Sequence, residues 1–207
     1  MRTRIKICGF TQVQDAVAAA GLGVDAIGLV FYPPSPRHVS IEQAVEIVKA
    51  LPAFVTVVAL FVDEQEAQIR EVLRSVSIDC IQFHGDESVE ACRIYNKPYM
   101  KAIRMKPGLD ILAIAAQYQD ATALLLDAYH PGIKGGSGSQ FDWDLIPEKC
   151  SLPVVLAGGL QVNNAKLAIE SVRPYALDVS SGVEAEKGIK DVAKMAAFIQ
   201  AINESDR

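Results

Sequence analysis

PVVLAGGLQVNNAKLAIESVRPYALDVSSGV, residues 153–183, holds one full period of a repeating pattern. A short apolar run at 153–157 ends in two glycines, an amphipathic segment follows at 163–171, and a second short run at 175–179 ends in SSG. Apolar residues that recur every three or four positions indicate a helix packed on a core. Short runs that are apolar throughout are typical of buried parallel strands. We therefore predict a strand–helix–strand unit with parallel strands.

The same alternation continues in both directions along the chain. Strands are predicted at 5–8, 25–31, 55–62, 79–83, 99–104, 123–127, 153–157 and 175–179. Helices are predicted at 11–20, 41–50, 64–76, 87–95, 109–118, 163–171 and 189–202, with a short helical turn at 142–146. Eight such units predict an α/β protein in which residues 1–207 form a single (β/α)8 TIM barrel domain. An open doubly wound sheet is the alternative, but no G-x-G-x-x-G follows the first strand.

Composition excludes several classes of function. The 207 residues carry a formal charge of −5, from 20 Lys plus Arg and 25 Asp plus Glu, with no basic stripe that would bind nucleic acid. No apolar run approaches the roughly 18 residues of a membrane span or forms a signal-peptide core. Four scattered cysteines and three histidines indicate neither zinc nor a disulfide framework. We expect a cytoplasmic protein, monomer or homodimer, that acts on a small molecule away from membranes.

Two glycine- and serine-rich turns follow the seventh and eighth predicted strands. Chemistry in a barrel is carried out at the carboxyl ends of the strands, and this pair of ends often binds phosphate. Gly158, Gly159 and Gly182 would let backbone N–H groups approach an anion closely, and Ser180 and Ser181 would add hydroxyl donors. One such turn alone also fits a simple tight turn. Two adjacent turns favour a phosphate site.

Cys8 and Asp127 form the second candidate constellation. Cys8 ends the first predicted strand and Asp127 the sixth, so in a ring of eight strands they face each other across the mouth. Isomerisation of a sugar needs such an acid and base on either side of the substrate. Neighbouring donors can lower the pKa of a thiol toward neutral pH, and partial burial keeps a carboxylic acid protonated. Taken singly, Cys8 also fits a packing cysteine and Asp127 a loop cap.

Arg37 is the third candidate. It follows PPSP at 33–36, where three prolines stiffen the loop, and its guanidinium would suit a carboxylate. A solvated surface arginine is the alternative interpretation. His84 is expected to be structural, whereas His38 and His130 are expected to face solvent. The remaining notable side chains are expected to pack the fold: Cys80, Cys92, Cys150 and Trp143.

In this order, the motifs resemble the phosphoribosylanthranilate isomerase family along nearly the whole chain. In the first half they are KICG (6–9), GLVFYPPSPR (28–37), QFHG (82–85) and KAIR (101–104). In the second half they are LLD (125–127), GGSGSQFDW (135–143), LAGGL (156–160), DVSSGVE (178–184) and GIKD (188–191). Each fragment alone is weakly specific. Their succession on consecutive βα units is strongly specific.

The resemblance implies a reaction in tryptophan biosynthesis. The implied substrate is N-(5-phospho-β-D-ribosyl)anthranilate, and the implied product is 1-(2-carboxyphenylamino)-1-deoxy-D-ribulose 5-phosphate. On this resemblance Asp127 is the general acid at the ring oxygen and Cys8 the general base at C2. Arg37 is implied to hold the anthranilate carboxylate, and the turns at 158–159 and 180–182 the phosphate. No metal and no organic cofactor are implied.

Other functions stay open at this level. Paired aspartates or a His/Asp metal set at the strand ends would favour another phosphosugar isomerase or epimerase on the same barrel, and Cys8 in place of a carboxylate argues against it. A thiol hydrolase would need a contact between Cys8 and His84. A barrel that only binds a phosphorylated ligand would show no turnover, and its affinity would not change when Cys8 or Asp127 is replaced. Acceptance of the related aminoaldose from histidine biosynthesis is also open.

Overall fold

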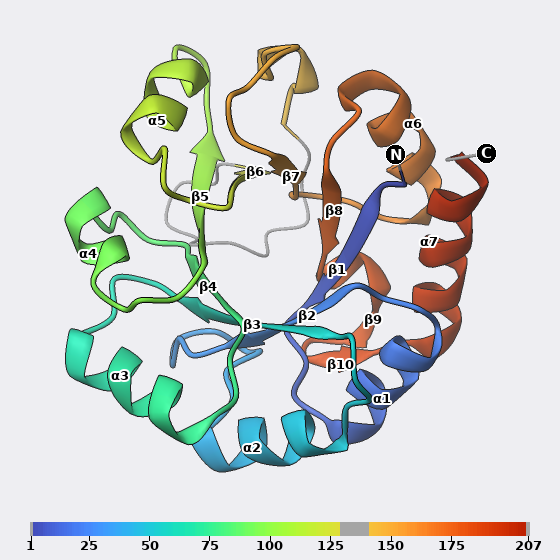
Figure 1. Cartoon of the computed structure of the whole chain (residues 1–207). Coiled ribbons are helices and arrows are strands. Elements are labelled where there is room, and N and C mark those ends of the chain that lie inside the picture. Colours follow the sequence, from blue (N-terminus) through green and yellow to red (C-terminus); the bar gives the residue numbers. More distant parts are fainter. Residues whose placement is uncertain (1, 129–140, 206–207) are drawn as a thin grey trace.

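A closed barrel of parallel strands forms the centre of the computed structural model, which describes residues 2–128 and 141–205 (Figure 1). The strands follow one another around the barrel in chain order: β1 Arg4–Cys8, β2 Ala26–Val30, β3 Thr56–Phe61, β4 Cys80–Phe83, β5 Tyr99–Met105, β6 Ala123–Ala128, β7 Val154–Leu156 and β8 Ala176–Val179. Lys6 of β1 pairs with Asp178 of β8, which closes the ring. The predicted (β/α)8 class is confirmed, and the open-sheet alternative is wrong.

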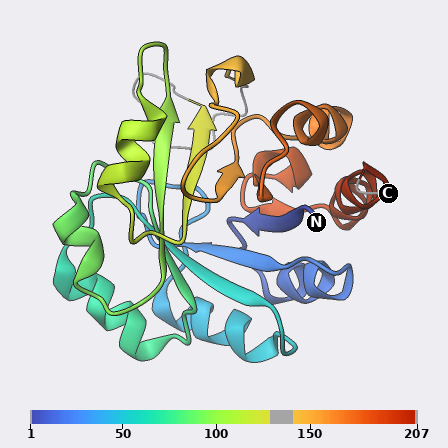
Figure 2. The same ribbon diagram turned by 45° about the horizontal axis from the view of Figure 1, so that its top comes forward.

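The helices lie around the outside of this barrel in both views (Figures 1 and 2). The α-helices are α1 Val13–Gly21, α2 Ile41–Ala50, α3 Glu66–Ser75, α4 Val89–Arg93, α5 Ile111–Gln117, α6 Val162–Val172 and α7 Val192–Ser205. Single 3-10 turns are η1 Trp143–Leu145 and η2 Ser181–Val183. All predicted helices are present, with bounds that differ by up to three residues. Within the described residues, no helix is both long enough and apolar enough to cross a membrane.

One predicted helix begins later than expected. Residues Ile189–Lys190 form a short strand, β10, which pairs antiparallel with β9 (Glu184–Glu186) instead of opening the last helix. The carboxylate of Asp191 accepts a hydrogen bond from the backbone N–H of Lys194, and α7 starts directly after this aspartate. An Asp that accepts from the third following N–H is a strong helix start signal. The hairpin therefore ends where the helix begins.

Alternation along the strands separates two packed regions. Ile5 and Ile7 of β1 belong to the large apolar cluster that also includes side chains from the surrounding helices. Lys6 and Cys8, the intervening residues, point to the inside of the barrel, as a period of two requires. The inside is filled mainly by small residues from several strands, such as Ala102 and Ala123, together with larger ones such as Leu125. This inner face ends in the functional side chains.

Candidate active site

A cavity opens at the carboxyl ends of the strands, where the sequence predicted the site. It is lined by ends or following turns of β1, β2, β3, β4, β6, β7 and β8. Most of the predicted site residues line it: Cys8, Arg37, Asp127, Gly158, Gly159, Ser180 and Ser181. Apolar side chains of β2 and β3, including Val30 and Leu60, form part of the wall. One cavity therefore brings together the proposed acid, base and phosphate-binding turns.

Gly182 is not among the described residues that line this cavity. A Cβ at this position would stand 1.9 Å from the carbonyl oxygen of Leu160, so no larger residue fits. Gly182 thus permits η2 to pack against the turn that follows β7. Its predicted contact with phosphate stays a prediction.

Cys8 is buried at the end of β1, against the backbone of β2. A Cβ on Gly28 of β2 would lie only 2.5 Å from the Cys8 sulfur, so the glycine makes room for the thiol. Lys6 lies two residues earlier on the same face, and its Nζ is 2.8 Å from Oδ2 of Asp178. Burial raises the pKa of the Cys8 thiol, while the Lys6 ammonium acts against this rise. From the sequence, neighbouring donors were expected to lower the pKa of Cys8. In the structure, the effect of burial outweighs that of the donors.

Lys6 remains charged in this setting. Burial acts to lower the pKa of Lys6, but attraction to Asp178 and to Cys8 outweighs burial and raises it. Oδ1 of Asp178 has no hydrogen-bond partner among the described residues, and Asp178 lines the cavity. The inner end of the cavity therefore carries a fixed cation beside the thiol and one carboxylate oxygen free to accept a bond.

Asp127 is the penultimate residue of β6 and lies across the cavity from Cys8. Its Oδ1 accepts a hydrogen bond from the N–H of Ala128 at 2.8 Å, and its Oδ2 lies 3.1 Å from Nε2 of His84. Gly158, with φ of +83°, passes so close that a Cβ there would stand 3.0 Å from Oδ1. Only glycine tolerates both this backbone angle and this approach. The turn after β7 therefore packs directly against Asp127, the proposed acid.

His84 is closer to the chemistry than expected. The sequence predicted a structural role for this residue, but it is buried and lines the cavity. It joins Asp127 to Gln82, whose Nε2 is 2.8 Å from Nδ1 of His84. The spacing Gln82-x-His84 on a buried strand was the available signal, since alternate residues share the inner face. No hydrogen bond joins His84 to Cys8 among the described contacts. His38 is exposed, as predicted, and His130 lies outside the described residues.

Arg37 is buried, so the solvated-surface interpretation is wrong. Its Nε and Nη2 donate to both carboxylate oxygens of Glu184, at 2.7 and 2.8 Å. The hydrogen bond to Glu184 raises the pKa of Arg37. Lys190 donates to the same carboxylate at 2.9 Å and to the carbonyl oxygen of Cys8 at 2.7 Å. Buried charges thus connect the loop after β2 to the end of β1.

The two predicted phosphate turns lie on adjacent strands, β7 and β8. The hydroxyl of Ser180 donates to the carbonyl oxygen of Cys8 at 2.9 Å. Nδ2 of Asn164, in the first turn of α6, donates to the carbonyl oxygen of Gly159 at 2.9 Å. These bonds hold both turns in place. Because the hydroxyl of Ser180 already donates to Cys8, the hydroxyl of Ser181 is the remaining candidate donor to a phosphate.

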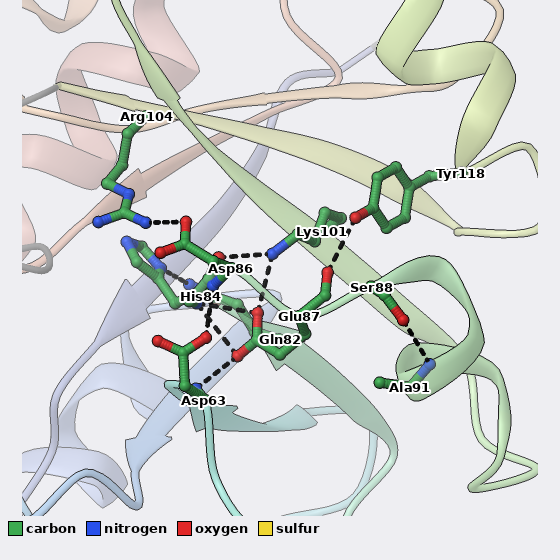
Figure 3. Close-up of polar contacts among 11 residues, drawn as sticks. Asp63, Gln82, His84, Asp86, Glu87, Ser88, Ala91, Lys101, Arg104 and Tyr118 are labelled. Atoms are coloured by element: carbon green, nitrogen blue, oxygen red, sulfur yellow. Dashed lines mark hydrogen bonds and ion pairs between the residues drawn. The ribbon is translucent and has the colours of Figure 1, made fainter.

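A buried ion pair supports the loop that follows His84 (Figure 3). Lys101 Nζ donates to Oε2 of Glu87 at 2.8 Å and to the carbonyl oxygen of Gly85 at 2.7 Å. Glu87 also accepts from the backbone N–H of Asp63 at 2.8 Å. The segment beginning at His84 is therefore tied to β3 and β5.

The other notable residues have packing roles. Cys80 and Cys92 are buried, Cys150 is half-buried, and Trp143 packs against the main core. In the described part of the chain, no group of three or more His, Cys, Asp or Glu side chains is arranged to hold a metal ion. The glycine-rich stretch at 134–139 lies outside the described residues.

Comparisons with known proteins find relatives that match nearly the whole chain. The family model for N-(5'phosphoribosyl)anthranilate (PRA) isomerase matches residues 5–201. The N-(5'-phosphoribosyl)anthranilate isomerase of Pseudomonas paraeruginosa is 56% identical over 204 residues, which cover 99% of this chain and 97% of that protein. A crystal structure of phosphoribosyl anthranilate isomerase from Thermotoga maritima superposes with a TM-score of 0.89 at 39% identity, covering 98% of this chain and 99% of that one.

A second similar structure holds a ligand. It is phosphoribosyl anthranilate isomerase in complex with reduced 1-(o-carboxyphenylamino)-1-deoxyribulose 5-phosphate, with a TM-score of 0.86 and 38% identity. The match covers 98% of this chain and 99% of that chain. That ligand carries a carboxylate, a secondary amine and a phosphate.

Proposed function

Because the chain belongs to the N-(5'-phosphoribosyl)anthranilate isomerase family, we propose that Cys8 and Asp127 are its catalytic base and acid. The enzyme converts N-(5-phospho-β-D-ribosyl)anthranilate to 1-(2-carboxyphenylamino)-1-deoxy-D-ribulose 5-phosphate, an Amadori rearrangement in tryptophan biosynthesis. One observation carries the assignment of roles. Cys8 from β1 and Asp127 from β6 line the same cavity from different sides.

The proposed mechanism has two proton transfers before the product forms. Asp127 gives its proton to the furanose ring oxygen, the C1–O bond breaks, and a protonated Schiff base forms between C1 and the anthranilate nitrogen. The thiolate of Cys8 then takes the proton from C2, which gives an enolamine. The enolamine then tautomerises to the ketone: the Cys8 thiol gives its proton to C1, and the C2 hydroxyl proton passes to the Asp127 carboxylate. No proton is gained or lost overall, so Asp127 is again protonated and Cys8 is again a thiolate at the end of the reaction.

The rest of the cavity suits the two charged ends of this substrate. Arg37 keeps N–H groups beyond the two held by Glu184, and we propose that they bind the anthranilate carboxylate. The turns that contain Gly158, Gly159, Ser180 and Ser181, together with Gly182, are proposed to hold the phosphate. The support is their position at the ends of β7 and β8, beside the thiol.

We extend the proposal to the setting of the enzyme. The chain is proposed to work in the cytoplasm as a monomer or homodimer, on a small-molecule substrate and without a nucleic-acid or membrane partner. No metal or organic cofactor takes part in the proposed steps. Another phosphosugar isomerase or epimerase activity is the second candidate, since the same acid, base and phosphate turns would serve it.

The proposed function is tested by the fluorescence of freshly generated phosphoribosylanthranilate. The purified wild-type chain should remove the anthranilate-type fluorescence far faster than a buffer control, and the product should have the mass of the substrate. The wild type should leave phosphosugars that lack the anthranilate group unchanged. A wild type that leaves the fluorescence untouched would favour a barrel that only binds a phosphorylated ligand.

A further inference from the structure

We propose that His84 is a positioning residue for the general acid, and that Gln82 in turn fixes the orientation of the His84 ring. The inference rests on the proposed role of Asp127. It assigns a function in the reaction to Gln82 in β4 and to His84 directly after it, on a strand that carries neither the proposed acid nor the proposed base.

The three side chains form a continuous buried chain. Gln82 lies in β4 and His84 directly follows the strand; the two are alternate residues, and both line the cavity. Gln82 is 1% exposed and His84 is 6% exposed, so water does not compete for these bonds. The distances are 2.8 Å from Gln82 Nε2 to His84 Nδ1 and 3.1 Å from His84 Nε2 to Asp127 Oδ2.

This arrangement determines where the ring hydrogen lies. As the Gln82 amide is oriented here, its Nε2, which is a donor only, faces Nδ1 of His84, so Nδ1 accepts from it. The hydrogen of a neutral imidazole is then on Nε2, from which it is donated to Oδ2 of Asp127. The imidazole acts as a fixed donor toward one chosen oxygen of the carboxyl group.

That choice leaves the other oxygen of Asp127 to carry the acid proton. Oδ1 lies next to Gly158, which lines the cavity, and it accepts only one hydrogen bond, from the N–H of Ala128, among the described residues. When Asp127 gives up this proton, the N–H groups of His84 and Ala128 stabilise the carboxylate that remains. Donors that are already in place favour the state in which charge develops.

Loss of the His84 donor should therefore slow turnover more than it weakens substrate binding. Nothing in the chain Gln82–His84–Asp127 needs to touch the phosphate or the anthranilate carboxylate. A carboxyl group free to rotate presents the wrong oxygen or a misplaced one, and a misplacement of about 1 Å can cost roughly 100-fold in rate.

The test measures kcat and KM for phosphoribosylanthranilate in the wild type, His84→Ala, His84→Gln, His84→Asn and Asp127→Asn. His84→Ala should lower kcat by about 10- to 100-fold, with KM changed less than about threefold. His84→Gln should recover about tenfold of this loss, because its amide nitrogen reaches the place of the imidazole Nε2. His84→Asn, one methylene shorter, should not recover it. His38→Gln, at an exposed histidine, is the matched control and should behave as wild type.

A second variant keeps the test valid if His84→Ala does not fold. Gln82→Glu is nearly isosteric, but its carboxylate can only accept, so Nδ1 of His84 must carry a hydrogen. The ring then either gives up the hydrogen on Nε2 or becomes a cation, and in both cases the neutral Nε2–H donor toward Asp127 is lost. This variant should lower kcat about tenfold and change the pH profile of kcat, which a purely structural change would leave unaltered.

The outcomes distinguish a failure of this inference from a failure of the proposed role of Asp127 on which it rests. An inactive wild type, or an Asp127→Asn variant with full activity, would overturn the proposed role of Asp127 and this inference with it. Suppose instead that the wild type is active and Asp127→Asn is inactive. The role of His84 alone would then be overturned by full kcat in His84→Ala, or by equal kcat in His84→Gln and His84→Asn. Wild-type kcat and an unaltered pH profile in Gln82→Glu would overturn the role of Gln82.

Discussion

The thiol of Cys8 is subject to two opposing influences at the residue scale. Burial raises its pKa and so disfavours the thiolate that a base must be, whereas the Lys6 ammonium favours that thiolate. Lys6 itself is held by Asp178 at 2.8 Å. The balance between these groups sets the pH at which the base becomes active. Charge on three side chains, rather than the thiol alone, therefore defines the catalytic base.

Removal of the Lys6 charge should shift the pH dependence of the reaction. In the wild type, kcat/KM should rise with pH until the thiol is ionised. This rise should occur above about pH 8.5, the ordinary pKa of a cysteine, because the pKa of Cys8 is raised. Lys6→Met removes the cation that acts most strongly to lower the pKa of Cys8, so that pKa rises further and the same rise in kcat/KM moves to higher pH. The measurement is the kcat/KM profile from about pH 6 to about pH 10.

The control for this variant removes both charges. Lys6→Met leaves Asp178 buried without its partner, which destabilises the fold by itself. The double variant Lys6→Met/Asp178→Asn avoids that unpaired charge, and because Asp178 also raises the pKa of Cys8, its profile should lie between those of the single variant and the wild type. A Lys6→Met profile identical to the wild type would contradict the account.

Space for the thiol is the second residue-scale requirement. Gly28→Ala would place a methyl group 2.5 Å from the Cys8 sulfur, so the thiol must move. We expect kcat/KM to fall by roughly 100-fold in steady-state assays. Gly21→Ala is the matched control, because a Cβ there meets nothing within 4 Å. Full activity in Gly28→Ala would show that the position of the thiol is not critical.

Individual site residues could be predicted from sequence only where the strand end itself marks them. Cys8 and Asp127 close apolar runs, so the pattern places both at the mouth of a barrel. The partners Lys6 and Asp178 are 172 residues apart and meet only because β1 closes on β8. The burial of Arg37 depends on Glu184, 147 residues away, in the same manner. Contacts of this kind follow from register, which the sequence pattern does not specify.

At the scale of elements, local signals were sufficient for strands and helices but not for the hairpin. The strands from β1 to β8 are apolar runs bounded by turn residues, and each was predicted within two residues. Strands β9 and β10 have three and two residues, too short to show a period, and Ile189 also fits the helical spacing of α7. A hairpin of this length exists because Glu184 and Lys190 meet in a buried ion pair.

The end of α6 is a strained element boundary. Its C-cap, Arg173, has φ of +49° and ψ of +51°, the left-handed conformation, and Pro174 follows. This conformation costs a non-glycine residue roughly 1–2 kcal/mol, so Arg173→Gly should raise the free energy of unfolding by about 0.5–1 kcal/mol. Urea denaturation of Arg173→Gly and Arg173→Ala would measure it. The alanine keeps the Cβ, so equal stability of the two variants would contradict the explanation.

At the scale of the whole molecule, the barrel is held together by contacts between distant parts of the chain. β1 pairs with β8, and the ion pairs of Glu184 with Arg37 and Lys190 join the loop after β2 to the segment after β8. We propose on this basis that residues 1–207 form one barrel domain. The closed ring supports this proposal, because its first and last strands depend on each other.

The charge on Glu184 should make the stability of the whole barrel depend on pH. Burial acts to raise the pKa of Glu184, but hydrogen bonding to Arg37 and the charge of Lys190 outweigh it and lower the pKa. A folded pKa below the unfolded value of about 4.3 gives stability that is present above that pH and lost as pH falls through the folded pKa. Denaturant unfolding from about pH 7 down to about pH 3 would test this.

Glu184→Gln isolates this contribution from those of other carboxylates. The wild type should be more stable than the variant near neutral pH, and the difference between them should shrink below about pH 4.3. A difference that stays constant across this range would mean that the charge of Glu184 does not stabilise the fold.

The most direct test of the account compares the rates of fluorescence loss of phosphoribosylanthranilate in wild type, Cys8→Ser and Asp127→Asn. The proposed acid and base predict fast loss in the wild type and rates at least about 100-fold lower in each variant, at similar folded stability. Nearly full rate in Cys8→Ser would contradict the assignment of the base, and nearly full rate in Asp127→Asn would contradict that of the acid.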